Sequence, residues 1–541
     1  MLTCLLAWMY ISLVSLVWGN IFLHVTKSQS SGPTINDPAL ICLAGLASSG
    51  TLACVLSIFW PIGLAVHLVL LLPVLIFMLF RTNRTKLLLQ VMSAFPVKPR
   101  AAILLVACIV MTLALSSYTI SHPDTLKYHI QNILWMHQFR AIPGSVHTGL
   151  HAGFQSLWFG MNALYHFDMH NGFPLFVNGA VLCWFFLFIC RRVGKESITM
   201  VMQAILLFVL AFTLFSWTQV RLTAASASPD FIVSVYILAA GYCLIKNKEK
   251  DGGCLVVLFC ATAIAIKLSA AVIILIPVYL IFEKLWKKSF RQAGIFFLIS
   301  FMMILPILVR NGISSGYLFY PSDIVQFDTR WTISSDTLQQ LRQYIRDYAR
   351  TGREIPLTAQ SAWLLNWWQH LAVADQMLLV ALIILCIFNL FFFRKLQIKT
   401  DRHQFVLFFT CLLATCMWFV MAPDPRFATG FLLLLLIFLL RPILSYASET
   451  FQRSLVNFFT GLLCSAVIAY TTYRFYRYTE PEQILVPAGV KTGSYEKIAC
   501  GNIMVNVPLK DSLCGAIPAP CSIGPCRFTP LGDQLTDGLS K

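Results

Sequence analysis

Long apolar stretches separated by short polar segments dominate the chain. Many of them hold about 18 or more nearly uncharged residues, which is enough for a helix to cross roughly 30 Å of hydrocarbon. Because a backbone in lipid must satisfy its own hydrogen bonds, this pattern predicts an all-α bundle of membrane-spanning helices. We expect fourteen spans, at 3–24, 38–58, 62–80, 101–120, 172–190, 198–218, 230–246, 253–266, 269–283, 292–310, 376–394, 404–421, 427–446 and 454–473.

Basic residues between the spans predict their orientation, since lysine and arginine collect in cytoplasmic loops. With the amino terminus outside, fourteen spans place every strong basic cluster on the cytoplasmic face. We therefore expect both termini to be extracytoplasmic. The clusters are Arg81, Arg84, Lys86, Lys98 and Arg100; Arg191, Arg192 and Lys195; Lys246, Lys248 and Lys250; Lys284, Lys287, Lys288 and Arg291; and Arg394, Lys395, Lys399 and Arg402.

Composition agrees with a membrane protein. Hydrophobic residues make up 58% of the chain and charged residues only 12%, more apolar side chain than a soluble surface can hide. The net charge of +17 does not indicate nucleic-acid binding, because the basic residues lie in short clusters between spans. Met1–Thr26 lacks a basic start and a cleavage site, so we interpret it as a retained span. The N-glycosylation pattern Asn83-Arg84-Thr85 falls on the expected cytoplasmic side, so it gives no support for a eukaryotic secretory setting. We therefore expect a bacterial cytoplasmic membrane.

The chain divides into an expected membrane domain, 1–475, and a small extracytoplasmic tail, 476–541. Two long loops, 121–171 and 311–375, are expected on the outer face, and loops of this length usually carry function. Within the second loop, 336–355 predicts an amphipathic surface helix.

Asp124 is the first candidate for a catalytic carboxylate. It follows the end of an apolar span by a few residues and starts a stretch in which Leu126, Ile130 and Ile133 form an apolar stripe. A helix of this kind is expected to lie along the membrane interface and to hold the acid at the outer face. The alternative is structural, because Ser121 and Asp124 fit a capping box.

Asp230 is a second acid at the start of a span. A carboxylate facing lipid there would be costly, so its side chain is expected to face a polar cavity. Capping is again the alternative, with Ser228 or Asp230 at the helix start and Pro229 in the first turn.

Three cations at span boundaries indicate an anionic head group on the same face. Lys267 interrupts an apolar stretch, Arg310 ends one and Arg426 precedes one. Each by itself would anchor a span by snorkelling to the interface. Together they predict a phosphate site, in which arginine binds bidentately and lysine acts as a point charge.

Histidine is concentrated in the first outer loop, where seven of the eleven histidines lie between His122 and His170. Histidine binds phosphate when charged and ligates metal when neutral, and His129 is a candidate for the first role. The spacing His166-x-Asp168-x-His170 would suit a divalent metal, the only cofactor that the sequence suggests. Interfacial hydrogen bonding is the alternative for these residues.

Four cysteines lie in the tail, at Cys500, Cys514, Cys521 and Cys526. Outside the cytoplasm, four cysteines in so short a stretch favour one or two disulfides, and three full pairings are possible. A zinc site is the alternative, although the spacing lacks a C-x-x-C pair.

Taken in order, these motifs resemble the GT-C superfamily of integral membrane glycosyltransferases. Protein mannosyltransferases and the aminoarabinose transferase of lipid A belong to that superfamily, and the resemblance covers roughly residues 100–430. The matching motifs are Pro123-Asp124-Thr125-Leu126-Lys127-Tyr128-His129, Ser228-Pro229-Asp230, Lys267-Leu268-Ser269, Arg310-Asn311-Gly312 with Ser315 to Pro321, and Pro425-Arg426-Phe427.

The resemblance implies an enzyme that takes a sugar from a polyprenyl-phosphate-linked donor. Asp124 matches the acid of the first outer loop, which acts as a base or metal ligand. The positions implied to contact substrate or its phosphate are Lys267, Arg310, Arg426, Tyr320, His129 and Asp230. Two departures leave the donor, the acceptor and a metal requirement open: Thr125 stands where several members have a second acid, and three spans precede the usual first helix.

Two other functions fit the same pattern of outer charges. A transporter or flippase of lipid-linked glycans would line a passage with them, and a polymerase or ligase of surface polysaccharide also uses a large outer loop and arginines. Transport predicts matching polar residues on the inner side of the spans, and the sequence shows few. We therefore expect transfer of a hexose or pentose to a lipid, glycan or protein acceptor.

Overall fold

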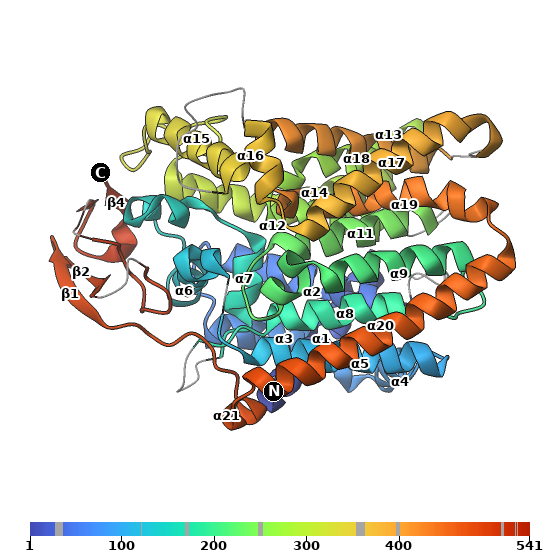
Figure 1. Ribbon diagram of the computed structural model, residues 1–541. Helices are drawn as coiled ribbons and strands as arrows, with labels where there is room; N and C mark the ends of the chain where they lie inside the picture. Colours follow the sequence, from blue (N-terminus) through green and yellow to red (C-terminus); the bar gives the residue numbers. More distant parts are fainter. Residues whose placement is uncertain are drawn as a thin grey trace.

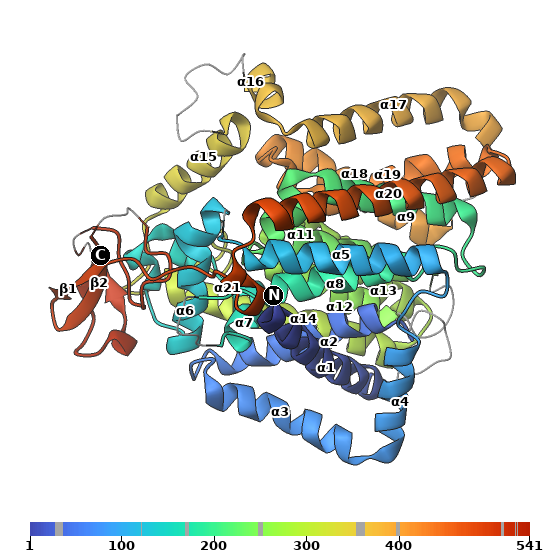
Figure 2. The ribbon, with the colours of Figure 1, turned by 60° about the horizontal axis from the view of Figure 1, so that its bottom comes forward.

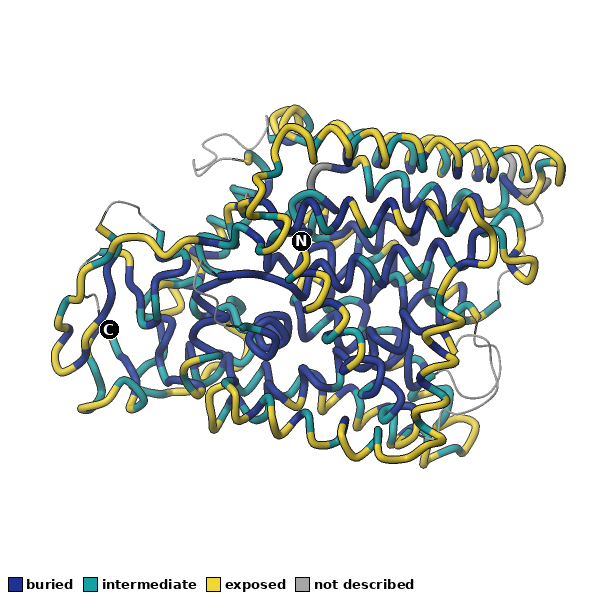
Figure 3. The backbone as a smooth tube through the Cα atoms, turned by 90° about the horizontal axis from the view of Figure 1, so that it is seen from below, coloured by how far each residue is buried: buried dark blue, intermediate teal, exposed yellow. Residues whose placement is uncertain are grey.

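The structure is a computed structural model that describes residues 1–26, 36–120, 122–167, 173–246, 253–352, 363–396, 401–509, 513–524, 526 and 528–541. Helices lie alongside one another in a bundle, and the carboxy-terminal tail packs at one end of it (Figure 1). This end is called the tail end below, and the opposite end the basic end. The backbone is buried inside the bundle and exposed along its outer helices (Figure 3).

Each predicted span overlaps a helix of the bundle. These helices are α1 (Leu2–Val25), α2 (Pro38–Leu56), α3 (Leu64–Leu79), α5 (Pro99–Ser117), α8 (Val177–Cys190), α9 (Met200–Phe215), α11 (Asp230–Lys246), α12 (Gly253–Ile266), α13 (Leu275–Trp286), α14 (Phe290–Ser315), α17 (Val373–Leu396), α18 (Arg402–Met421), α19 (Thr429–Tyr446) and α20 (Glu449–Tyr478). The shorter helices between them are α4 (Arg81–Met92), α6 (Ile130–Gln138), α7 (Leu157–Leu164), α10 (Leu222–Ala224), α15 (Ser335–Thr351), α16 (Trp363–His370) and α21 (Pro481–Leu485).

Length and composition confirm a multi-pass, all-α membrane protein. Among the described residues, nine helices are long and apolar enough to span a membrane, or ten if α3 and α4, which meet at 98°, form one broken span. Helices α8, α9 and α12 are apolar but shorter. The number fourteen therefore stays a prediction. Helices α3 and α17 expose leucine and isoleucine side chains along much of their length, as expected for lipid-facing helices.

Polar residues between the apolar stretches begin the helices. Asp37 caps α2, since its carboxylate accepts hydrogen bonds from the Ala39 N–H at 3.0 Å and the Leu40 N–H at 3.3 Å. The same carboxylate pairs with Arg192 at 2.9 Å and Arg191 at 3.4 Å, at the end of α8. The basic end is therefore held by an acid that both caps a span and neutralises two arginines.

Both termini lie at the tail end. The amino group of Met1 donates a hydrogen bond to the Gln483 carbonyl at 2.6 Å, and the Thr3 hydroxyl donates to the Leu485 carbonyl at 2.7 Å. The chain reaches α21 through the long helix α20, which lies alongside α5 (Figure 2). The two termini thus lie at the same end of the bundle, and their placement on the extracytoplasmic face of a membrane stays a prediction.

The tail contains two small antiparallel sheets and two disulfides. Strand β1 (Tyr495–Cys500) pairs with β2 (Ile503–Pro508), and β3 (Thr529–Pro530) pairs with β4 (Leu539–Ser540). The disulfides join Cys500 to Cys526 and Cys514 to Cys521, so these cysteines form disulfides and not the alternative zinc site. The Leu539 N–H donates to the Pro143 carbonyl at 2.9 Å, which ties the tail to the first long loop.

Helix α15 has the amphipathic character predicted for 336–355, although 353–355 lie outside the described residues. Ser334 caps it, and Leu338 and Leu341 bury its apolar face. Its neighbour α16 carries Trp367, whose indole N–H donates to the Pro423 carbonyl at 2.6 Å. These two helices therefore lie at the tail end, near the turn between α18 and α19.

Labelling from each side of the membrane tests this topology. A cysteine at Gln339, exposed on α15, should react with an impermeant thiol reagent only from the side of the tail. A cysteine at Lys98, exposed at the basic end, should react only from the opposite side. Mass spectrometry of the labelled peptides separates them from native cysteines. Reaction of both positions from the same side would contradict the arrangement.

Candidate functional site

Charged residues from four distant segments meet at the tail end of the bundle. Arg426, in the turn between α18 and α19, places Nη1 at 3.7 Å from Asp124 Oδ2 and 3.8 Å from Asp230 Oδ2. Lys267, which follows α12, donates a hydrogen bond from Nζ to Asp230 Oδ1. The fold therefore brings together four of the residues that the sequence singled out, and we call Asp124, Asp230, Lys267 and Arg426 the charged cluster.

A local turn fixes the Arg426 side chain. Asp424 caps a short helical turn that begins with Pro425, and its Oδ1 accepts the Arg426 N–H at 3.0 Å. The guanidinium also binds the Asp424 carboxylate, with Nη2 at 2.7 Å from Oδ2 and Nε at 3.0 Å from the same atom. The charge of Asp424, opposed by burial, raises the pKa of Arg426, so this arginine stays charged. Asp424 was missed from the sequence, although the spacing Asp-Pro-Arg could have revealed it.

The Asp230 carboxylate contacts the two cations of the charged cluster, while Ser228 provides a hydrogen bond at the start of α11. The Ser228 hydroxyl accepts the Asp230 N–H at 3.4 Å, and the Pro229 carbonyl accepts the Val233 N–H at 2.9 Å, which begins α11. The carboxylate of Asp230 is thereby left for Lys267 and Arg426. The Lys267 ammonium also lies 3.9 Å from the centre of the Phe427 ring.

Asp124 starts the π-helical turn Thr125–His129, and its side chain makes no capping hydrogen bond there. Ser121, its proposed capping partner, lies outside the described residues. The Asp124 side chain is 35% exposed, against 11% for Asp230 and 17% for Asp424. Asp124 is thus the most accessible of these three carboxylates.

Two buried imidazoles lie beside the charged cluster. The rings of His122 and His129 are 5.6 Å apart, and His129 Nδ1 lies 3.1 Å from the Thr125 hydroxyl. Burial lowers the pKa of His122, against the opposing charges of Asp230 and Asp124, and it lowers the pKa of His129 further. Both imidazoles are therefore neutral at neutral pH, which argues against His129 as a cationic phosphate ligand.

Only His166 of the predicted metal motif lies within the described residues, so the metal site stays a prediction. The ring of His166 stacks on Phe173 with centroids 4.1 Å apart, and Asp168 and His170 lie outside the described residues. Within the described part of the chain, no group of three or more His, Cys, Asp or Glu side chains is arranged to hold a metal ion.

The described hydrogen bonds of Arg310 do not involve the charged cluster. Its Nη1 donates to the Ser57 carbonyl and hydroxyl, both at 2.9 Å, and its Nε donates to Gln155 Oε1 at 2.9 Å. Arg310 is 4% exposed, and no carboxylate of the described residues pairs with it. We expected all three cations to meet at one point. Lys267 and Arg426 do so, whereas Arg310 binds Ser57 and Gln155 instead.

Two hydroxyl groups tie the first long loop to other segments. The Tyr320 hydroxyl donates to the Leu150 carbonyl at 2.6 Å, so it supports the first long loop. The Ser156 hydroxyl donates to the Ile266 carbonyl at 2.7 Å, which ties Gln155 to the residue before Lys267. The Arg310 and Lys267 environments are thus linked through a single short segment of that loop.

Asp375 is a second acid that sequence reasoning missed. It lies in the first turn of α17, is 4% exposed, and has a carboxylate oxygen without a hydrogen-bond partner in the described structure. Its position after the tryptophans of α16, at the mouth of a predicted span, was the available signal.

Protonation of the buried imidazoles should reduce stability at acid pH. An unfolded histidine has a pKa near 6.5, and burial lowers the pKa of His129 in the folded protein. Below about pH 6.5 the unfolded state binds more protons, so the free energy of unfolding falls, whereas above it this contribution is complete. His129→Gln should therefore lose less thermal stability than the wild type between about pH 7.5 and 5.5. An equal loss of stability in both proteins would exclude His129 as a cause of the pH dependence. His370→Gln, which removes an exposed imidazole, is the control.

Comparison with known proteins places the chain in a family. No curated protein matches it, and no solved structure matches it. A family model, described as a domain of unknown function (DUF8201), matches residues 1–433, a range that contains every residue of the charged cluster. The chain is a member of this DUF8201 family.

Proposed function

We propose that the protein is a membrane glycosyltransferase that moves a sugar from a polyprenyl-phosphate donor to a hydroxyl acceptor at the extracytoplasmic face. The observation that supports this most is the exposure of Asp124, whose side chain is 35% exposed beside the less exposed Arg426 and Asp230. A carboxylate held by Arg426, close to a membrane exit and open to solvent, can meet both a lipid-borne donor and a water-borne acceptor. The resemblance to the GT-C superfamily supports the same reaction.

The proposed reaction is a single displacement at the anomeric carbon. Asp124 accepts the proton of the acceptor hydroxyl as its oxygen bonds to that carbon, and the bond from carbon to phosphate oxygen breaks. The electron pair leaves with the polyprenyl phosphate. General-base assistance of this kind contributes about 10²–10⁴-fold to a rate. Phosphate is already a good leaving group, so positioning of the two substrates supplies much of the remainder.

Charge balance suggests which cation holds the phosphate. Lys267 and Arg426 already face the carboxylates of Asp124, Asp230 and Asp424, so a phosphate bound there would compete with three acids. Among the described residues, the acceptors of Arg310 are all neutral oxygens. A buried guanidinium without a counter-ion favours an anionic ligand. We assign the donor phosphate to Arg310, with Lys267 and Arg426 organising the acids.

The number of fourteen spans and the GT-C arrangement of the helices are part of the same proposal. Fourteen spans would make helices α3, α8, α9, α11 and α12 cross the membrane together with the nine longer helices. Basic clusters at the basic end support this count, because it places them on one face. A GT-C arrangement would then put the charged cluster at the outer interface, where donor and acceptor meet.

Product formation by purified protein tests the proposal. The protein in lipid nanodiscs would be given polyprenyl phosphates carrying labelled hexoses or pentoses, together with lipid, glycan and peptide acceptors. Transfer predicts label in an acceptor and an equal amount of released polyprenyl phosphate. Intact donor that crosses a liposome membrane without bond cleavage would indicate the alternative, a lipid-linked glycan transporter, and would overturn the enzymatic proposal.

A further inference from the structure

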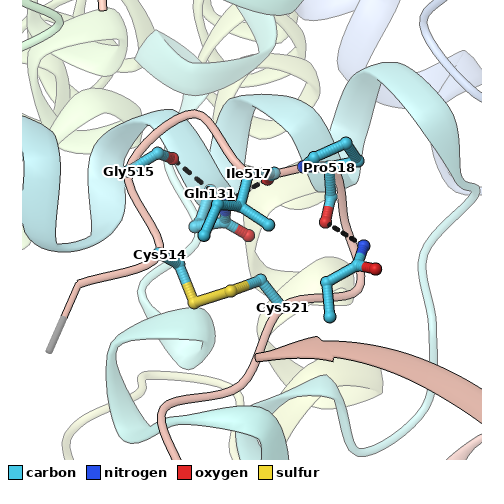
Figure 4. Close-up of a disulfide and its surroundings, with 7 residues drawn as sticks. Gln131, Cys514, Gly515, Ile517, Pro518 and Cys521 are labelled. Carbon is cyan, nitrogen blue, oxygen red and sulfur yellow. Dashed lines mark hydrogen bonds between the residues drawn. A yellow bond between two sulfur atoms is a disulfide. The ribbon is translucent and has the colours of Figure 1, made fainter. Parts of the chain in front are cut away.

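The carboxy-terminal tail contacts the helix that begins at Asp124. Gln131 lies in α6, directly after the π-helical turn, and is 7% exposed. Its side-chain Nε2 donates hydrogen bonds to the Gly515 carbonyl at 3.0 Å and the Ile517 carbonyl at 2.8 Å. Both hydrogens of the amide are thereby committed to the tail. Figure 4 shows Gln131 pointing into the loop that contains these two carbonyls.

A backbone hydrogen bond reinforces this contact. The Gly515 N–H donates to the Leu126 carbonyl at 3.2 Å, inside the π-helical turn and two residues after Asp124. The tail thus binds the turn at Leu126 and the helix at Gln131. Asp124 itself has no capping hydrogen bond to the turn, so its position depends on how this segment is held.

The Cys514–Cys521 disulfide shapes the loop that makes these contacts. It closes a loop with a sequence separation of 7, and Ile517, which is 1% exposed, packs with both cysteines in one apolar cluster. The Ile517 N–H donates to the Cys514 carbonyl at 2.9 Å. Asn506 on β2 donates from Nδ2 to the Pro518 carbonyl at 2.8 Å, which fixes the loop to the sheet. The three groups that contact Leu126 and Gln131 are therefore presented by a closed, packed loop.

The second disulfide is different in its surroundings. Cys500 and Cys526 pack with Ile503, Val505, Phe528 and Leu539 in a separate apolar cluster, and this cluster contains no residue of the Asp124 segment. The Cys500–Cys526 disulfide therefore serves as a control for the Cys514–Cys521 disulfide, because only the second closes the loop that contacts the Asp124 segment.

We propose that Gln131 and the Cys514–Cys521 loop are a positioning device, which holds Asp124 in its working geometry through the turn at Leu126. We call the contacts of this loop with Leu126 and Gln131 the brace. The effect of the brace on catalysis rests on the proposed function of Asp124, whereas the brace itself is a structural claim. Activity would then require an oxidised, docked tail. Gln131 is a positioning residue, because it acts on the reaction only through the helix that carries the acid.

Hydrogen exchange on the full-length protein tests the brace without any substrate. In Cys514→Ser/Cys521→Ser, amide exchange in residues 125–131 should be about tenfold or more faster than in the wild type, as expected from the loss of ordinary hydrogen bonds. Exchange in α5 and α7 should not change. Cys500→Ser/Cys526→Ser should leave 125–131 unchanged. Equal protection of 125–131 in the wild type and the first variant would overturn the brace.

Gln131→Met provides a second variant that keeps both disulfides and nearly the same side-chain volume. It removes the two side-chain hydrogen bonds to the tail and should also accelerate exchange in 125–131, while wild-type exchange there would contradict a role for Gln131. In a turnover assay, kcat should fall about 10- to 100-fold in both variants with KM unchanged. Faster exchange with unaltered kcat would overturn the positioning claim. An inactive wild type would instead count against the proposed function and leave the exchange result as the test of the brace.

Discussion

Asp124→Asn is expected to reduce sugar transfer by about 10²–10⁴-fold while the protein folds normally. Asparagine is nearly the same size as aspartate, but its amide cannot take the proton of an acceptor hydroxyl. Because the Asp124 side chain is about one-third exposed and caps no helix, its replacement should cost little stability. The rate of product formation under saturating donor and acceptor, measured beside the thermal midpoint, separates the two effects.

Asp336→Asn is a suitable control for this substitution. Asp336 is an exposed acid in the first turn of α15 and makes the same change of charge at the same end of the molecule. It should keep wild-type turnover. An Asp124→Asn protein that turns over within a few-fold of the wild type would remove Asp124 from the catalytic role.

Arg426→Gln is expected to destabilise the protein by about 3–5 kcal/mol. Arg426 is the common partner of Asp124, Asp230 and Asp424, and its side chain is only 15% exposed. Glutamine would leave these carboxylates facing one another with Lys267 as the remaining cation of the charged cluster. The loss of stability can be measured as a lower thermal midpoint in detergent and a lower midpoint of chemical unfolding.

The exposed pair of Arg342 and Asp323 provides the comparison. Its atoms approach to 2.7 Å, closer than Arg426 approaches Asp124, yet both side chains are open to solvent. Arg342→Gln should leave the midpoint unchanged, because solvent screens an exposed pair. Equal decreases of the midpoint in Arg426→Gln and Arg342→Gln would show that burial does not strengthen the ion pairs of the charged cluster.

The spans could be predicted because their signal is local. An apolar stretch of sufficient length predicts a helix whatever its neighbours are, and α1, α2 and α5 begin and end within a few residues of the expected positions. The 98° bend between α3 and α4 was not predicted, because it depends on how the segment after Phe80 packs. Both termini lie at one end of the bundle, which is compatible with the expected even number of crossings, although that number stays a prediction.

The charged cluster was predicted residue by residue, from the cost of placing a charge at the mouth of a span. Its assembly follows from topology, since Asp124, Asp230, Lys267 and Arg426 all lie at span ends on one side. Arg310 lies at the same end, but the face of α14 on which it stands directs it toward Ser57 and Gln155. A single sequence does not specify that rotation, because it depends on the neighbouring helices.

Tertiary packing decided the remaining features. The four tail cysteines allowed three pairings, and the fold selects Cys500–Cys526 and Cys514–Cys521 because β1, β2 and the loop after them bring these side chains together. The docking of Gly515 and Ile517 on Gln131 joins segments 384 and 386 residues apart, for which the sequence carries no local signal.

A double-mutant cycle between Asp124 and Arg426 tests most directly whether distant segments assemble one charged site. Unfolding free energies would be measured for the wild type, Asp124→Asn, Arg426→Gln and the double variant. The 3.7 Å approach predicts a coupling of about 0.5–1 kcal/mol, near the low end for contacting residues because solvent reaches Asp124. Additive effects within about 0.3 kcal/mol would mean that these two residues do not meet, and the charged cluster would then not exist as described.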